Sequence, residues 1–170
     1  VLERTVRELK GQSCITLHDF MEPKKQIMVS RSFGKSIRSK SVLSEAISFH
    51  ASRAAEKLRY EKQKCRLITA FIRSNRFNTR VRQIYAAKSF ELVHPTDDTR
   101  IIIKNANRIL DQIFADGYQY AKAGVLLSDF TNRYGYQMSL FDKKRDEKMA
   151  SRLMQTVDYI NLMEIAKIGF

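Results

Sequence analysis

The sequence has few of the residues on which disulfide-stapled or metal-bound folds depend. It contains only two cysteines, Cys14 and Cys65, which lie far apart without a CxxC spacing. This usage disfavours a disulfide scaffold and a zinc site, and it predicts a reducing compartment, the cytoplasm. Cys65 lies in a strand-like run, where a buried free thiol is expected.

Long apolar runs are also missing. No stretch is long enough to span a membrane, and no signal peptide opens the chain, so no membrane partner is expected. The 170 residues, 44% of them apolar, suit one folded domain with appendages. Because the chain begins at Val1 without a methionine, we expect it to be a piece of a longer protein.

Residues in catalytic patterns are lacking as well. The three histidines, His18, His50 and His94, are scattered, whereas metal sites need clusters. Asp97 and Asp98 are explained as a helix cap and need no pair of metal ions. No glycine-rich phosphate loop is present. We therefore predict no catalytic residue, no metal ligand and no cofactor for this chain.

Acidic residues are scarce between positions 24 and 82, where only Glu45, Glu56 and Glu61 occur. The same stretch holds sixteen basic residues: Lys24, Lys25, Arg31, Lys35, Arg38, Lys40, Arg53, Lys57, Arg59, Lys62, Lys64, Arg66, Arg73, Arg76, Arg80 and Arg82. The excess of thirteen equals the net charge of the whole chain. A localised positive field favours a polyphosphate partner, and the alternative is a solvated, solubilising surface.

What is present is strong secondary-structure patterning. The spacing of Leu2, Val6 and Leu9 predicts a helix over 1–10 that Gly11 ends, followed by a linker over 12–23. A strand over 26–33, ended by Gly34, and a helix over 41–63, capped by Ser41, are expected next. A strand over 66–73, a loop over 75–83 and a strand over 87–93, closed by His94 and Pro95, follow. The last elements are a helix that Asp97 and Asp98 open and Gly117 ends, and a strand over 120–130.

This order predicts an α+β fold of βαββαβ type, with four antiparallel strands and both helices on one face. The inner stripes are expected at Leu43, Ile47, Ala51, Ala54 and Leu58 and at Ile102, Ala106, Ile109, Leu110 and Ile113. Arg53, Lys57 and Arg59 fall mostly outside the first stripe. The other face of the sheet stays open to a partner. Alternation places Arg31 and Arg66 on the side that the apolar residues bury.

A second pattern follows the domain. Asn132 to Gly135 breaks the strand, and a partly apolar peptide runs from Tyr136 to Phe141. An amphipathic helix is then expected over 143–165. Its apolar stripe would be Met149, Leu153, Val157 and Ile160. Nothing in the first 130 residues obviously requires this helix.

The candidate nucleic-acid contacts combine small hydroxyls, a glycine and arginines, which let backbone amides and forked guanidiniums hold phosphates. They are Lys25, Ser30, Arg31, Ser32, Gly34, Arg73, Arg76, Arg80, Arg82 and Lys88. Their alternative is an exposed strand face and solvated loop arginines. Single-stranded RNA is a further possible ligand of an open sheet face, but RNA-recognition modules use an aromatic-rich strand, and 87–93 offers only Phe90.

Several runs together resemble the UmuC family, the catalytic subunits of bacterial DNA polymerase V, which are Y-family lesion-bypass polymerases. The runs are VLERTVRELKG at 1–11, SRSFG at 30–34, SRAAEKLR at 52–59, KAGVLLSDF at 122–130 and QMSLF at 137–141. The resemblance implies that residues 1–23 are the end of the thumb and its linker, and that 24–130 are the little finger, which grips template-primer DNA. Residues 131–170 would hold a clamp-binding peptide and a helical tail. The family's palm domain, with its magnesium-binding carboxylates, would precede Val1.

The resemblance also assigns partners. Gln137, Met138, Ser139, Leu140 and Phe141 match the family's peptide for the beta sliding clamp, with Met138 in place of the commoner leucine. Gln137 would bond at the pocket rim while Leu140 and Phe141 fill an apolar groove. UmuD′ and the recombinase filament are further implied partners.

The expected function is therefore that of a non-catalytic C-terminal fragment, which holds template-primer DNA and tethers an error-prone polymerase to the clamp during SOS damage bypass. The alternatives are a free-standing module that binds DNA or RNA, and a protein–protein adaptor.

Overall fold

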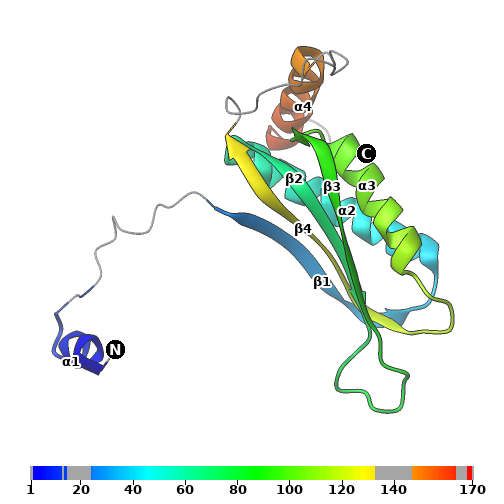
Figure 1. Cartoon of the computed structure of the whole chain (residues 1–170), viewed down its shortest axis with the longest axis horizontal. Helices are drawn as coiled ribbons and strands as arrows, with labels where there is room; N and C mark the ends of the chain where they lie inside the picture. Colours follow the sequence, from blue (N-terminus) through cyan, green and yellow to red (C-terminus); the bar gives the residue numbers. More distant parts are fainter. Residues whose placement is uncertain (1, 13, 15–23, 133–146, 164–167, 170) are drawn as a thin grey trace.

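Two helices pack on one face of a four-stranded antiparallel sheet in the computed structural model (Figure 1). The structure describes residues 2–12, 14, 24–132, 147–163 and 168–169. Its elements are α1 (Leu2–Leu9), β1 (Gln26–Ile37), α2 (Lys40–Tyr60), β2 (Gln63–Arg73), β3 (Tyr85–Thr96), α3 (Thr99–Ile113), β4 (Tyr120–Asn132) and α4 (Glu147–Leu162). The strand order is β1-β4-β2-β3. The predicted α+β fold is confirmed.

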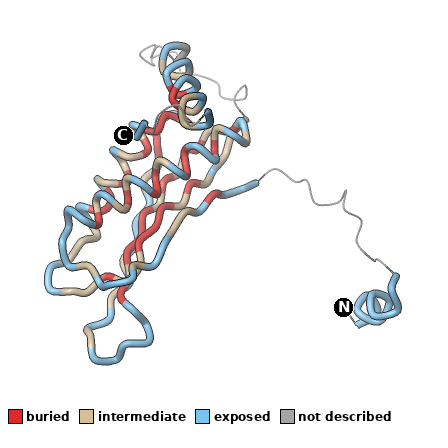
Figure 2. The backbone as a smooth tube through the Cα atoms, turned by 180° about the vertical axis from the view of Figure 1, so that it is seen from behind, coloured by how far each residue is buried: buried red, intermediate tan, exposed pale blue. Residues whose placement is uncertain are grey.

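The core lies between the sheet and the inner faces of α2 and α3 (Figure 2). The whole stripe predicted for α2, from Leu43 to Leu58, is inaccessible to solvent, and so are Ile68 of β2 and Leu127 of β4. Four of the five α3 residues predicted to face inward are buried, and Ile113 is partly buried against the same cluster. Because burying one such side chain stabilises a fold by about 1.5–3 kcal/mol, this layer determines which face of each strand is covered.

The strand ends differ from the prediction at two irregular edges. β1 continues through Gly34 to Ile37, and its register against β4 shifts between Ser32 and Ile37. β3 continues through Pro95 to Thr96, and its register against β2 shifts beside Cys65. Both strands are edge strands, where a bulge, a glycine or a proline interrupts no second ladder. The residues taken as strand terminators therefore mark bulges.

The helix ends were predicted in part. Asp98 is the N-cap of α3, and its carboxylate accepts a hydrogen bond from the Arg100 amide at 2.9 Å. At α2 the N-cap is Ser39 and not Ser41, and the hydroxyls of these two serines bond to each other at 2.7 Å. α3 ends at Ile113, so that Gly117, with φ +83°, belongs to the turn after it.

The N-terminal helix agrees with its prediction. α1 ends at Leu9, and Gly11 follows in the left-handed conformation with φ +78°. No residue of α1 is buried, and its apolar side chains Leu2 and Leu9 are more than 80% exposed.

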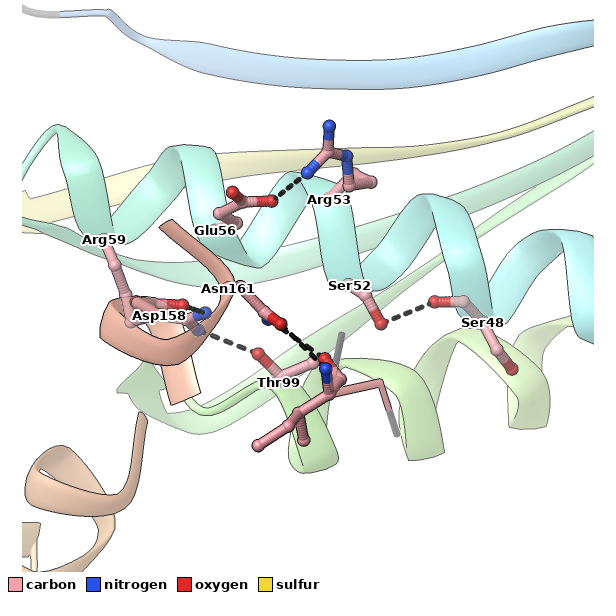
Figure 3. Close-up of polar contacts among 9 residues, drawn as sticks. Ser48, Ser52, Arg53, Glu56, Arg59, Thr99, Asp158 and Asn161 are labelled. Carbon is pink, nitrogen blue, oxygen red and sulfur yellow. Dashed lines mark hydrogen bonds and ion pairs between the residues drawn. The ribbon is translucent and has the colours of Figure 1, made fainter. Parts of the chain in front are cut away.

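The C-terminal helix docks on the domain, which corrects the expectation that the first 130 residues do not need it. Arg59 of α2 holds the Asp158 carboxylate through two hydrogen bonds of 2.6 Å (Figure 3). The same guanidinium donates to the Asp97 carbonyl and the Thr99 hydroxyl, each at 2.8 Å. Only 9% of the Arg59 side chain is exposed. Arg59 is thus a structural residue.

The apolar face of α4 is also shifted from the predicted one. Met154 and Val157 are buried, whereas Met149 and Leu153 are 71% and 41% exposed. Val157 belongs to the predicted stripe, whereas Met154 was not predicted. The bonds from Arg59 fix Asp158 against the domain, which is consistent with Met154 facing inward in place of Leu153.

A close approach of two strands depends on Gly124 of β4. A Cβ atom there would lie 2.4 Å from the Ser30 Cβ and 2.5 Å from the Cζ of Phe71. Ser30 and Phe71 are the register partners of Gly124 on β1 and β2. The Phe71 ring therefore lies flat across the middle of the sheet only because position 124 has no side chain.

His50 is a buried histidine in α2, and neither ring nitrogen has a hydrogen-bond partner among the described residues. Burial lowers the pKa of His50 from its ordinary value, and the positive charge of Arg31 adds to the shift. The folded chain therefore holds this imidazole neutral.

We predict that Gly124→Ala lowers the free energy of unfolding by about 1–3 kcal/mol, because the added methyl overpacks the Ser30 and Phe71 contacts. Urea unfolding followed by circular dichroism measures the change. Gly34→Ala is the matched control, since a Cβ at position 34 meets nothing within 4 Å. Equal stability of the two variants would contradict the close-packing argument.

We predict a pH dependence of stability that His50 causes. The unfolded chain takes up a proton as the pH falls through about 6.5, whereas the folded chain resists it, so stability is full above this pH and declines below it. In His50→Leu the decline between pH 7 and pH 5 should be smaller than in the parent chain. Urea midpoints across this range test the idea, and an unchanged slope in the variant would refute it.

Candidate nucleic-acid interface

The face of the sheet opposite α2 and α3 is built from small and polar side chains. Register partners share a face, so the sheet can be followed in rows across its strands. One row joins Met28, Leu126, Thr69 and Ser89, and the next joins Ser30, Gly124, Phe71 and Ala87. We call this surface the open face. The Thr69 and Ser89 hydroxyls bond to each other at 2.7 Å, and only Phe71 among these side chains is buried.

A third row carries the positive charge of the open face. It joins Ser32 of β1, Lys122 of β4, Arg73 of β2 and Tyr85 of β3, and we call it the basic row. Tyr85 is 70% exposed. The basic row lies at the end of β2 and the start of β3, where the β2–β3 loop (74–84) leaves the sheet at the end of the domain opposite α4 (Figure 1).

The β2–β3 loop holds three further arginines and is braced from within. The Gln83 amide donates to the Asn78 carbonyl at 2.7 Å, and the Ser74 hydroxyl donates to the Gln83 side chain at 3.0 Å. Arg82 stacks over the Tyr118 ring, 4.7 Å from its centroid. Arg76 and Arg80 are exposed. Arg76 and Arg80 thus face solvent, while the contact of Arg82 with Tyr118 holds the loop against the domain.

A hollow opens at the root of this loop, with a volume of about 490 Å³. Its lining residues are Arg73, Ser74, Arg76, Gln83, Ile84 and Tyr85. Two guanidiniums and a phenol border this space, and no carboxylate does. Such a set of donors suits a phosphate group.

Ion pairing decides where the positive field is concentrated. At least five of the sixteen basic residues between 24 and 82 pair with carboxylates. Lys24 pairs with Glu61 and Lys40 with Asp111. Arg53, Arg59 and Arg66 are paired as well. Arg73, Arg76, Arg80 and Arg82 form no ion pair within the part of the chain that the structure describes. The basic row and the loop thus hold a group of cations that no described carboxylate neutralises.

The ten predicted contacts fall into two groups. Ser30, Ser32 and Arg73 lie on the open face, and the three loop arginines lie at its basic end. Gly34 lies in the exposed bulge of β1 at this end of the sheet. The other three lie elsewhere: Lys25 precedes β1 at the opposite end, and the register places Arg31 and Lys88 on the helix side. The parity predicted for Arg31 is confirmed.

Sequence reasoning missed Lys122 and Tyr85. Lys122 completes the basic row because β4 lies between β1 and β2 in the sheet. The alternation of side chains within residues 120–130 places Lys122 on the face opposite Val125, and this pattern could have predicted that Lys122 lies on the open face. The pairing with Arg73 requires the strand order, which is not a local property of the sequence.

A second concavity lies behind the helices, between α2 and α4, with a volume of about 700 Å³ (Figure 3). Arg53 and Glu56 border it, and their side chains form an ion pair of 2.6 Å. The Asn161 side-chain amide donates a hydrogen bond to the Ile168 carbonyl and accepts one from the Ile168 backbone amide. Its charged groups are largely paired with one another. This space lies at the packing interface between α2 and the segment formed by α4 and residues 168–169.

No catalytic centre is found in the described ranges. They contain no group of three His, Cys, Asp or Glu side chains that could hold a metal ion. Burial raises the pKa of the Cys65 thiol to about 12, and the thiol donates to the Thr96 carbonyl, so Cys65 is not a nucleophile at neutral pH. None of the described helices is long and apolar enough to cross a membrane. The arrangement can bind anions.

Known proteins place the chain in a family. Over its full length it is 46% identical to protein SamB of Salmonella typhimurium, and over 95% of its length it is 40% identical to protein UmuC of Salmonella typhimurium strain LT2. It spans about 40% of the length of these relatives. A solved insertion ternary complex of Dbh DNA polymerase is similar over 75% of this chain and 34% of that one, at 13% identity and a TM-score of 0.48.

The family model of the impB/mucB/samB C-terminal domain matches residues 24–140, which include the whole sheet, both covering helices and the β2–β3 loop. The chain therefore belongs to the impB/mucB/samB family, as a C-terminal domain.

Proposed function

We propose that this chain is the non-catalytic C-terminal part of an error-prone translesion DNA polymerase and that it grips the backbone of template-primer DNA. The observation that carries the proposal is the basic row beside the β2–β3 loop, on a sheet face that neither α2 nor α3 covers. The high identity to UmuC-type relatives, of which it spans about 40%, supports a role as one part of a larger enzyme.

The contacts suit a duplex backbone more than base edges. Arginine and lysine side chains hold phosphates through charge-assisted bonds, and such bonds fix register without reading sequence. A polymerase that moves along any template needs this kind of grip.

The second part of the proposal is a tether to the beta sliding clamp through Gln137 to Phe141. This peptide lies outside the described residues, and its support is the sequence QMSLF directly after the domain. Contacts with UmuD′ and the recombinase filament are proposed for the whole protein without assignment to residues. The domain would act in the cytoplasm, and the catalytic magnesium would belong to the polymerase domain that precedes it.

We predict that the affinity for primer-template DNA falls steeply between low and moderate salt. Arg73→Ala and Lys122→Ala should each flatten the salt slope by about 0.9, the value for one phosphate contact on B-DNA. Fluorescence anisotropy over a salt series measures the slopes. Arg53→Ala is the control, because Arg53 lies on α2 and pairs with Glu56. A flat salt response, or an equal change in the control, would contradict a backbone grip on the open face.

We predict that Leu140→Ala combined with Phe141→Ala abolishes clamp binding and leaves DNA binding intact. Each anchor in an apolar groove contributes about 2 kcal/mol or more, so the double variant should lose about 4 kcal/mol, or roughly 1,000-fold, in clamp affinity. Surface plasmon resonance on immobilised clamp measures it, and the DNA anisotropy assay on the same sample is the folding control. Retained clamp binding would show that the tether lies elsewhere.

A further inference from the structure

Phe77, in the β2–β3 loop, is an exposed aromatic side chain on a strongly basic support. Its side chain is 93% exposed, the highest value among the large apolar side chains that the structure describes. A single exposed phenylalanine is ordinary on a protein surface. Phe77 differs in its surroundings, because its chain neighbour Arg76 and nearby Arg80 are exposed cations and no carboxylate occurs between Glu61 and Glu91.

The loop is built to hold this ring outward. The Phe77 amide donates to the Asn75 side chain at 3.0 Å, and the Arg80 amide donates to the Asn78 side chain at 3.1 Å. Gln83 then ties Asn78 to the root of the loop. A turn fixed in this way loses little conformational entropy when it binds, so an exposed ring on it can contribute most of its stacking free energy.

The chemistry around the ring identifies the kind of partner. Arg76 borders the hollow at the root, together with Arg73 and Tyr85, and it adjoins Phe77 in the chain. A phosphate site and an aromatic ring thus lie next to each other. Proteins that hold single strands combine these two elements, because aromatic rings stack on bases while cations follow the backbone. The high positive charge excludes a basic protein surface as the partner.

The exposed position of the ring at the loop tip favours an unpaired base over a base in a duplex. In an intact duplex both faces of each base are stacked, and opening a step costs a few kcal/mol. An unpaired base has a free face and needs no such opening. A ring at the tip of a loop can meet that face directly.

We infer that the tip of the β2–β3 loop is a binding site for an unpaired nucleotide of a DNA strand. Phe77 stacks on the base, and Arg76, with Arg73 behind it, holds the adjacent phosphate. The inference rests on the proposed DNA grip and adds a preference to it: the chain binds DNA that carries a single-stranded segment more tightly than a blunt duplex of equal length.

The test compares three fluorescein-labelled DNAs, a single strand, a duplex with a 5′ overhang and a blunt duplex, by anisotropy with the whole chain. Phe77→Ala should lower the affinity for the first two by about 5- to 100-fold, the range of one base–aromatic stack, and leave the blunt duplex unchanged. Tyr60→Ala is the matched control, since Tyr60 is 87% exposed on α2, away from the loop.

A spectroscopic readout separates stacking from a loss of folding. The sequence contains no tryptophan, so Phe77→Trp introduces a single tryptophan at the tip, which can be excited selectively over the tyrosines. Its fluorescence should be quenched by the single strand and by the overhang duplex, and not by the blunt duplex.

The outcomes distinguish this inference from the proposed function. Equal losses on all three DNAs for Phe77→Ala, or no loss on any, would overturn the nucleotide site while leaving the backbone grip in place. A parent chain that binds none of the DNAs would overturn the proposed function and the nucleotide site together.

Discussion

One-sided burial of the sheet is the constraint on which the rest of this structure depends. α2 and α3 cover the face that carries Ile68 and Leu127, and the free energy of burying those side chains fixes the parity of all four strands. A slip of one residue in any strand would expose its core side chains. The opposite face is thereby released from packing, and it can carry serines, a glycine and the basic row without cost to the core.

The second constraint is electrostatic. A count of charges along residues 24–82 overstates the free positive charge, because Glu91, Asp111 and Asp158, which lie later in the chain, each neutralise one of its cations. Pairing with these later acids leaves the cations of the basic row and the β2–β3 loop without a described carboxylate partner. The result is a field with a direction, produced by where the acidic residues fold as much as by where the basic ones lie.

The sequence predicted the fold well because the periodicities of α2, α3 and the strands are strong and agree with one another. It failed where tertiary contacts decide. Gly34 and Pro95 resembled terminators, but bulges in edge strands accommodate both residues. Arg59 resembled a surface cation, because its pairing with Asp158 spans 99 positions. The candidate interface contains the loop arginines, Ser30 and Ser32 that the sequence proposed, whereas the place of Lys122 beside Arg73 needed the strand order.

The two ends of the domain therefore have different tasks. At one end, Arg59 joins α4 to α2 through two hydrogen bonds to Asp158 and contacts the start of α3 through two more, to Asp97 and Thr99. At the other end, the β2–β3 loop continues the basic row beyond the sheet and ends in Phe77. A duplex along the open face would be held by its phosphates up to the loop, and a strand that continues past the duplex would next meet an aromatic ring. On the proposed function, the fold would place a contact for paired DNA and a contact for unpaired DNA in sequence along one axis.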